Sequence, residues 1–268
     1  MKDISRFAFT WATVLGTCFM SKATAGIIPV TLSNTVATCD DCFSSAVPIN
    51  IDGPLGIDLF GVTTPQIYIN NNGNITFNSG LSTYTPNGLA TGVGQPIIAP
   101  FFGDVDTRGT GTVTYGNAVI GGVNAFVVDW NAVGYYNAQT DKTDTFQLVL
   151  YDESALGAGD FNIQFNYGSV QWETGQASGG TDGLGGTSAV AGYSNGLSGP
   201  SNVYYQLPGS LVNGALIDGG PDSLQALGSV TFDVRNGAVT SAVPEPATLP
   251  MLAVSGLFLL LFRRRIIR

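Results

Sequence analysis

Short runs of alternating apolar and polar residues, separated by turn residues, constrain the fold of this chain more than any other feature. Residues 66–77 (QIYINNNGNITF) alternate in this way around Asn72-Gly73, a dipeptide typical of tight hairpins because glycine accepts a positive φ. Further short runs rich in Val, Ile, Phe, Tyr and Thr cover residues 112–115, 125–130, 145–151, 161–167, 170–172, 190–193, 203–207 and 229–234. Because no segment between the two chain ends carries a helical apolar stripe, we predict an all-β fold, an antiparallel β-sandwich with long glycine-rich loops.

The longest glycine-rich stretch covers residues 175–186 (GQASGGTDGLGG). Glycine supplies 36 of the 268 residues, about twice the usual share, and it does not follow a collagen repeat. No side chain restrains the backbone of this stretch. We therefore expect a loop that is mobile or that covers a ligand.

Composition excludes several classes of function. The chain contains no histidine, which removes the commonest general base and every Ser-His or Cys-His nucleophile pair, so we expect a protein that is not an enzyme. Residues 26–242 hold all but two of the 19 acidic residues and only three of the ten basic ones. A surface this acidic repels phosphate backbones, so we expect no nucleic-acid partner, whereas divalent cations are tolerated.

The N-terminus has the three-part layout of a secretory signal peptide. Lys2 and Arg6 precede a mostly apolar stretch, residues 7–20, which is followed by a small-residue motif ending at Ala25. We predict a signal helix over residues 1–25, with cleavage between Ala25 and Gly26. The alternative is a short buried helix.

The C-terminus ends in a short apolar segment and a basic cluster. Residues 249–262 carry no charge and would span roughly 21 Å as a helix, against about 30 Å for a hydrocarbon core. Arg263, Arg264 and Arg265 follow, and arginines of this kind stay on the cytoplasmic side. We predict a short transmembrane helix that leaves the rest of the mature chain outside the cell.

An extended connector, Pro244-Glu245-Pro246, stands just before this segment, since two prolines around one residue cannot continue a helix. Residues 243–268 therefore resemble the PEP-CTERM sorting tail of bacterial exported proteins: Pro-Glu-Pro, a short apolar helix and a terminal arginine cluster. The resemblance implies recognition by an exosortase-type membrane processing enzyme, in a Gram-negative bacterium that also exports polysaccharide. A plain tail anchor is the alternative.

Cys39 and Cys42 are the cysteines left after signal removal, and disulfides persist outside the cell. Two intervening residues suit a turn that brings the Cα atoms within bridging range, so we predict a local disulfide. Asp40-Asp41 has the wrong sign to activate a thiol, and the chain lacks further soft ligands for zinc.

Asp104 and Asp106 share one face of an extended chain, so their two carboxylates converge. They are candidates to bind Ca²⁺ through oxygen, or to form a structural network with Arg108. A calcium site needs about six oxygens, which other regions would have to donate, for instance Asp129, Asp152 or Asp160. A glycosidase that uses the same pair with Glu173 is a weaker alternative.

A set of aromatic residues offers either an exposed platform for sugar stacking or ordinary core side chains, and we favour the core. The set comprises Trp130, Tyr135, Tyr136, Trp172 and Tyr193.

Several sequence blocks in the middle of the chain recur in the order seen in the extracellular nidogen-like (NIDO) domain, which this region resembles. The blocks are residues 59–61, 67–77, 97–108 (IIAPFFGDVDTR), 128–136, 145–152, 159–167, 191–195 and 205–209. We accordingly divide the chain into a signal peptide (1–25), an N-terminal segment with both cysteines (26–59), a NIDO-like β domain (60–242) and a sorting segment (243–268). The resemblance implies adhesion or matrix association, and it carries over no catalytic residues.

Together these observations predict an exported, non-catalytic protein of the cell surface or extracellular matrix, associated with biofilm exopolysaccharide. We expect its β domain to bind exopolysaccharide or a surface protein, with Ca²⁺ as the candidate cofactor. Two alternatives remain: a secreted glycan hydrolase or lyase that uses carboxylates, and a coat protein that assembles through its sheet edges.

Overall fold

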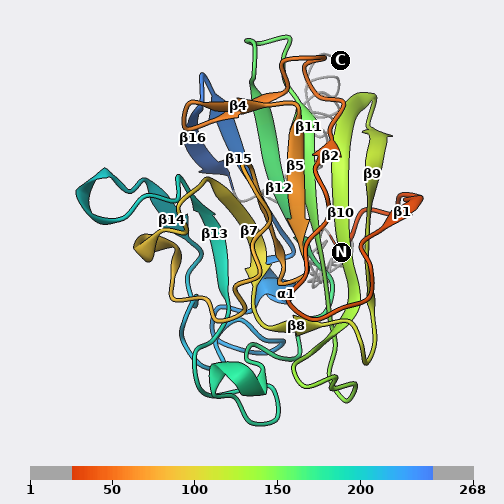
Figure 1. Cartoon of the computed structure of the whole chain (residues 1–268), viewed down its shortest axis with the longest axis vertical. Coiled ribbons are helices and arrows are strands. Elements are labelled where there is room, and N and C mark those ends of the chain that lie inside the picture. The colour runs from red at the N-terminus through yellow and green to blue at the C-terminus, as the bar shows by residue number, and fades with distance from the viewer. Residues whose placement is uncertain (1–25, 244–268) are drawn as a thin grey trace, which may run out of the picture.

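The computed structural model describes residues 26–243 (Figure 1). The expected signal helix (residues 1–25), the Pro-Glu-Pro connector, the expected transmembrane helix (residues 249–262) and the arginine cluster lie outside this range. Within residues 26–243, no helix has the length and apolar character needed to cross a membrane.

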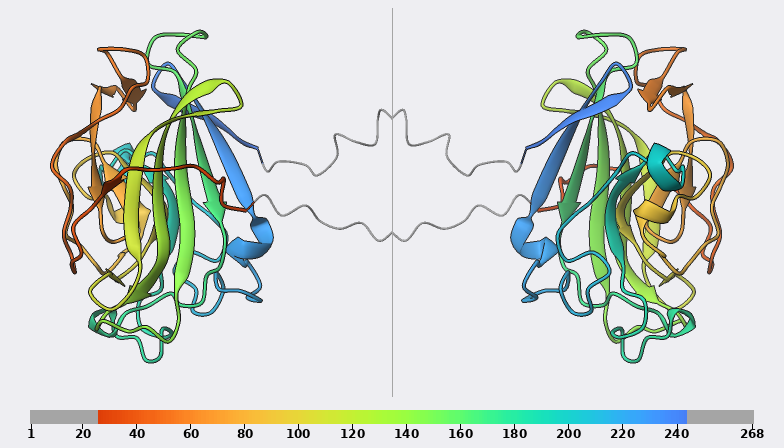
Figure 2. Two further views of the ribbon diagram at one scale, coloured as in Figure 1. Left: turned by 90° about the vertical axis from the view of Figure 1, so that its right-hand side faces the viewer. Right: turned by 90° about the vertical axis from the view of Figure 1, so that its left-hand side faces the viewer.

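Two antiparallel sheets form the two layers of the fold (Figures 1 and 2). The larger sheet has the order β1 (Asn34–Thr35), β9 (Thr112–Ile120), β10 (Val123–Tyr135), β11 (Asp144–Asp152), β12 (Phe161–Tyr167), β15 (Ser229–Arg235) and β16 (Ala238–Val243), with β8 (Val105–Asp106) paired to β10. The smaller sheet has the order β14 (Tyr204–Gln206), β13 (Val190–Ser194), β7 (Ile97–Phe102), β6 (Asn74–Thr76), β5 (Gln66–Asn70) and β2 (Val47–Pro48). A separate hairpin joins β3 (Ile57–Leu59) to β4 (Val62–Thr64). The predicted all-β, antiparallel character is confirmed.

The hairpin expected around Asn72-Gly73 is present between β5 and β6. Asn70 pairs with Asn74, and residues 71–73 form the turn. Gly73 has φ 76°, and a Cβ atom at this position would lie 1.7 Å from the carbonyl oxygen of Phe101 on β7. The turn is pressed against the neighbouring strand so closely that only glycine fits there.

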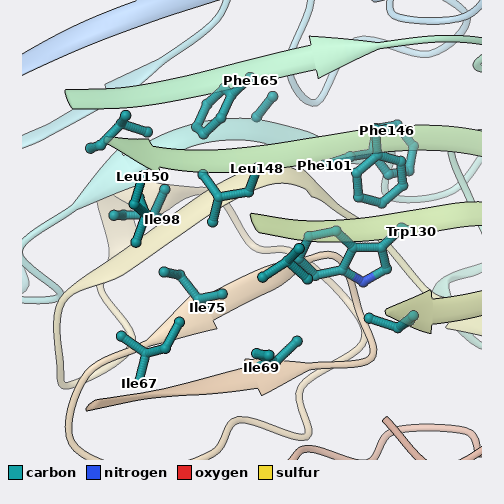
Figure 3. Close-up of a cluster of buried hydrophobic side chains, with 14 of the residues drawn as sticks. Ile67, Ile69, Ile75, Ile98, Phe101, Trp130, Phe146, Leu148, Leu150 and Phe165 are labelled. Carbon is teal, nitrogen blue, oxygen red and sulfur yellow. The ribbon is translucent and has the colours of Figure 1, made fainter. Parts of the chain in front are cut away.

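The core lies between the two sheets and follows the period-two pattern of the strands (Figure 3). On β12, the four alternate side chains that face the core are buried: Phe161, Ile163, Phe165 and Tyr167. Trp130 of β10 stacks on Phe146 of β11, with ring centroids 5.1 Å apart. These fully buried rings belong to the same cluster as Ile75 and Ile98 of the smaller sheet, so the two layers share one apolar interior.

One predicted strand is wrong. Residues 170–172 are extended but do not join a sheet. Their backbone N–H groups donate instead to side chains: Gln171 N and Trp172 N to Asp144 Oδ1 at 2.6 and 3.2 Å, and Val170 N to Asp218 Oδ1 at 2.9 Å. The carboxylates of buried Asp144 and half-buried Asp218 thus accept from the N–H groups that would otherwise have paired with a neighbouring strand.

Helical structure among the described residues is limited to α1 (Leu224–Leu227) and the 3₁₀ turns η1 (Leu89–Thr91), η2 (Gln176–Ser178) and η3 (Gly199–Ser201). Turn η2 belongs to the glycine-rich loop. Backbone hydrogen bonds hold this loop, among them Gly180 N to Gly175 O at 3.0 Å and Thr187 N to Ser178 O at 2.9 Å. A side chain holds it as well, since Gly185 N donates to Asn213 Oδ1 at 2.6 Å, so the expectation that no side chain restrains this backbone is wrong.

Candidate functional site

The candidate site lies where the cysteine loop meets the segment that contains Asp104 and Asp106. Cys39 and Cys42 form a disulfide with a Cα–Cα distance of 6.0 Å. The loop is fixed on one side by Thr107 N, which donates to Cys39 O at 3.0 Å, and on the other by Asn71 N, which donates to Cys42 O at 2.9 Å. It therefore brings Asp40 and Asp41 next to the β5–β6 turn and to β8.

Asp106 has a complete set of partners. Arg108 donates from Nε to Oδ1 at 2.9 Å and from Nη2 to Oδ2 at 2.6 Å, and Ala138 N donates to Oδ2 at 2.8 Å. Burial alone would raise the pKa of Asp106, but the hydrogen bonds from Arg108 and Ala138 bring it below its usual value. The carboxylate is thus part of an aspartate–arginine network, the second of the two roles that the sequence offers for it.

Asp104 is as buried as Asp106 but lacks its partners. The residue is 1% exposed, and neither carboxylate oxygen accepts a hydrogen bond of normal geometry from the described residues. Burial raises the pKa of Asp104 to about 7, with further increases from the charges of Asp41, Asp40 and Asp106. The Ser178 hydroxyl acts in the opposite direction, but its Oγ is paired with Thr85 Oγ1 at 2.8 Å and leaves both oxygens of Asp104 without a donor. A buried carboxylate without a donor is costly, and it calls for a partner.

Two acidic residues of the cysteine loop face Asp104. One carboxylate oxygen each from Asp40, Asp41 and Asp104 lies within 4.8 Å of the other two. Asp40 binds Arg108 Nη2 through Oδ2 at 2.9 Å, whereas its Oδ1 is buried without a partner. Burial, followed by repulsion from Asp41 and Asp106, raises the pKa of Asp40 to about 6, although Arg108 acts in the opposite direction.

Asn72 completes the edge of this cluster. Its Nδ2 donates to Asp41 Oδ1 at 2.8 Å and to Thr83 O at 3.2 Å, which fixes the orientation of the amide. Its Oδ1 is buried and has no partner among the described residues. We expected Asn72 only as part of the hairpin turn, so the role of its side chain in this cluster is an addition from the structure.

The other expected oxygen donors, and the glycosidase candidate Glu173, lie elsewhere in the fold, and of these Asp129 has a buried Oδ1 without a partner among the described residues. Asp152 Oδ1 accepts from Ser154 N at 3.0 Å, and Asp160 Oδ1 accepts from Asn236 N at 2.7 Å. Asp129 lies on β10 and lines a shallow pocket with residues of the N-terminal segment. Glu173 is fully buried, and its Oε2 accepts from Gly214 N at 2.7 Å. None of the four belongs to the cluster around Asp104.

Sequence reasoning missed Asp40 and Asp41 as candidate ligands. The signal was available, because two adjacent acidic residues inside a four-residue disulfide loop are held where their charges cannot separate. We used the pair only to argue against a redox role for the cysteines.

The aromatic set does not form an exposed platform. Trp130, Tyr135 and Trp172 are buried in the core, as we favoured. Tyr136 is half-buried under the Arg108 guanidinium, which lies 5.9 Å from its ring centroid. Tyr193 is half-buried and packs against Phe232.

Fold and site together define an all-β antiparallel domain with a disulfide loop and an acidic cluster in which Asp104 is buried. The profile of the Nidogen-like domain matches residues 65–124 and 117–216, more than half of the chain, and the chain belongs to this family. The profile of the PEP-CTERM protein-sorting motif matches residues 242–265. This is accordingly an exported protein, and its motif implies processing by an exosortase.

Curated relatives support the assignment. The chain is 32% identical over 195 residues to alpha-tectorin of Homo sapiens, and this match covers 64% of the chain and 8% of the relative. It is 36% identical over 168 residues to alpha-tectorin of Gallus gallus, a match that covers 54% of the chain and 8% of the relative. It is 28% identical over 170 residues to nidogen of Drosophila melanogaster, a match that covers 51% of the chain and 11% of the relative. The chain thus matches about a tenth of the length of these relatives. No solved structure gives a significant match.

The residues that match the family profile include only part of the candidate site. Asn72, Asp104, Asp106 and Arg108 lie within the matched residues, whereas Asp40 and Asp41 precede residue 65, where the match begins. The acidic cluster therefore joins a residue of the family domain to the N-terminal segment of this chain.

Proposed function

We propose that this chain is a non-catalytic protein of the cell surface or of an exopolysaccharide-rich biofilm matrix, and that its β domain binds exopolysaccharide or a surface protein. The observation that carries the proposal is the combination of a nidogen-like domain with a PEP-CTERM sorting motif in one chain. The resemblance of the tail to those of Gram-negative bacteria that export polysaccharide supports the matrix as its destination.

The geometry of the carboxylates supports binding over catalysis. Asp106 is saturated by donors from Arg108 and Ala138, and Glu173 by backbone amides that include Gly214 N. A general acid or nucleophile must reach its substrate, and both of these groups are fully buried. Two of the three carboxylates that the enzymatic alternative would use, Asp106 and Glu173, are thus held in structural hydrogen bonds.

Co-sedimentation with exopolysaccharide purified from the producing cells tests the proposal. We expect the exported protein to sediment with this polysaccharide and not with dextran, while the chain length of the polysaccharide stays constant. If the protein shortens the polysaccharide and the Asp104→Asn variant does not, the enzymatic alternative is correct.

Self-assembly into a coat is a second candidate, because one sheet edge is open. β14 ends the smaller sheet, and its first residue, Tyr204, and the preceding Val203 are 47% and 52% exposed. An apolar edge strand is a template for pairing with a second chain. Light scattering over a range of protein concentrations tests this candidate. A mass that rises with concentration in the wild type but not in Val203→Lys would favour the coat, and a constant monomer mass would exclude it.

A further inference from the structure

The acidic cluster around Asp104 has the chemistry of a cation site. All of its side-chain donors are oxygens, because the chain has no histidine and both neighbouring cysteines are held in a disulfide. Carboxylate and amide oxygens are the ligands of hard cations, whereas soft metals prefer sulfur and imidazole. We infer that Asp40, Asp41 and Asp104 bind one Ca²⁺ ion, with Asn72 Oδ1 as a fourth ligand.

Convergence of acidic residues alone would not carry this inference, but the state of Asp104 points independently to a ligand. Its carboxylate is buried, has no donor among the described residues, and directs an oxygen to within 4.8 Å of Asp40 and Asp41. Buried polar groups in native proteins are nearly always satisfied by a partner. A cation placed between the three carboxylates would supply that partner.

The dimensions fit a calcium ion. Calcium–oxygen distances of about 2.3–2.6 Å place opposite ligands about 4.6–5.2 Å apart, so oxygens within 4.8 Å of one another can share one ion. Asp104 has two free oxygens, and Asp40 Oδ1 and Asn72 Oδ1 are also free. With one oxygen of Asp41, the protein offers five oxygens, and water would complete a shell of about six to eight ligands.

The surrounding charges leave the cluster negative. Arg108 is the cation that contacts it, but the guanidinium is divided between Asp106 and Asp40 Oδ2. Asp41 and Asp104 have no ion pair among the described residues. One divalent cation would offset this excess without displacing Arg108 from its partners.

The glycine-rich loop covers the buried side of the site. A Cβ atom at Gly175 would lie 2.3 Å from Asp104 Oδ2, so no larger residue can be accommodated there. Ser178 follows in the same loop, and its Oγ is 2.8 Å from Thr85 Oγ1. Asp40 and Asp41, by contrast, are only half-buried, so an ion would enter from the side of the disulfide loop. This arrangement gives the loop the covering role that is one of the two we expected for it.

Calcium titration of the exported protein after treatment with chelator tests the inference, which does not depend on the proposed function. We expect one Ca²⁺ per chain by equilibrium dialysis, a dissociation constant in the range of about 10⁻⁴–10⁻³ M found for extracellular modules, and a rise in the midpoint of thermal unfolding. Asp104→Asn and Asp41→Asn should each weaken binding at least about tenfold. Asparagine suits position 41 because its φ of 57° is one that asparagine readily adopts.

Two controls separate a lost ligand from a damaged fold. In chelator, Asp104→Asn should unfold at the same or a higher temperature than the wild type, since it removes a buried, unpartnered charge. Asp222→Asn removes an exposed charge outside the glycine-rich loop and should keep the full calcium response. A wild type that responds no more than Asp104→Asn would overturn the inference. An equal response to Mg²⁺, or an equal loss in Asp222→Asn, would also overturn it.

Discussion

Buried carboxylates in this domain have very different surroundings, and the donors around each one decide its chemistry. Asp106 accepts from a guanidinium and from Ala138 N, so its charge is stabilised. Asp104 has no such donor among the described residues. Asp144 is intermediate, because Oδ1 accepts from two backbone amides while Oδ2 is buried without a partner. Aspartate thus has three roles here: Asp106 binds Arg108, Asp104 is a candidate ligand, and Asp144 accepts hydrogen bonds from the backbone of residues 171 and 172.

Asp144→Asn should change how stability depends on pH. Burial raises the pKa of Asp144 well above its usual value, the amides of Gln171 and Trp172 lower it, and the charges of Asp218 and Glu173 raise it further. The folded state therefore holds the proton more tightly than the unfolded state does. The free energy of unfolding consequently falls as pH rises from about 3.9, the unfolded value, through the raised pKa. The asparagine variant lacks this loss, so its free energy of unfolding should decline less with pH.

Urea denaturation at several pH values above about 4 measures this difference. Asp182→Asn is the matched control, since it removes an exposed charge and should follow the wild type. Parallel pH profiles for the wild type and Asp144→Asn would show that Asp144 is not buried as described.

Gly73→Ala should be far more damaging than Gly121→Ala, although both glycines have a positive φ, of 76° and 61°. A Cβ atom at Gly73 would collide with the Phe101 carbonyl, whereas a Cβ atom at Gly121 meets nothing within 4 Å. Backbone strain alone costs about 1–2 kcal/mol, and forced repacking adds about 1–3 kcal/mol. We expect losses of about 2–5 kcal/mol at Gly73 and about 1–2 kcal/mol at Gly121 by chemical denaturation. Equal losses would contradict the close approach of the turn to β7.

At the scale of elements, the disulfide loop joins parts of the chain that are distant in sequence. Its backbone hydrogen bonds reach Asn71 in the β5–β6 turn and Thr107 after β8. The backbone of Asp40 also forms an isolated antiparallel β-bridge with that of Asp106. Because the loop carries two of the inferred calcium ligands, the disulfide and the cation would act on the same contact between the N-terminal segment and the domain.

Replacing both cysteines by serine should affect stability and calcium binding together. Closing so short a loop stabilises the folded state by about 2 kcal/mol in the chain-entropy treatment. We expect a loss of about this size by denaturation in chelator. The calcium affinity should also fall, although every ligand remains, because Asp40 and Asp41 are held less firmly. An unchanged affinity would show that the backbone bonds of the loop suffice to hold them.

Elements with a strong local signal were predictable from the sequence, and elements defined by tertiary contacts were not. Asn72-Gly73 marked the β5–β6 hairpin because the turn requires a residue that accepts a positive φ. Strands such as β1 and β2 have two residues each, too few for alternation to be visible. The strand expected at residues 170–172 failed because Asp144 and Asp218 take its donors. The meeting of Asp104 with Asp40 and Asp41 depends on long-range backbone bonds that no local pattern encodes.

At the scale of the whole molecule, the chain separates a folded domain from its sorting signal. Residues 26–243 contain two sheets with a shared core, and the sorting motif begins at residue 242, where β16 is ending. The matched motif therefore overlaps the last two residues of β16, and its Pro-Glu-Pro follows Val243 in the sequence. Because no residue of the shared core, within the part of the chain that the structure describes, comes after β16, we expect that Pro244, Glu245 and Pro246 can be altered without damage to the domain.

Replacing Pro244, Glu245 and Pro246 by alanine should alter sorting and leave the domain intact. The substitutions remove both prolines and the glutamate from the start of the motif, and alanine permits helix where proline does not. We expect the variant to accumulate in the membrane fraction with its tail attached, whereas the wild type reaches the surface or the medium with a lower mass. Fractionation and intact-mass measurement of both chains test this. Asp222→Asn should behave as the wild type does, and calcium should raise the unfolding midpoint of all three chains equally. If the triple variant were released with the same mass as the wild type, processing would not depend on this connector.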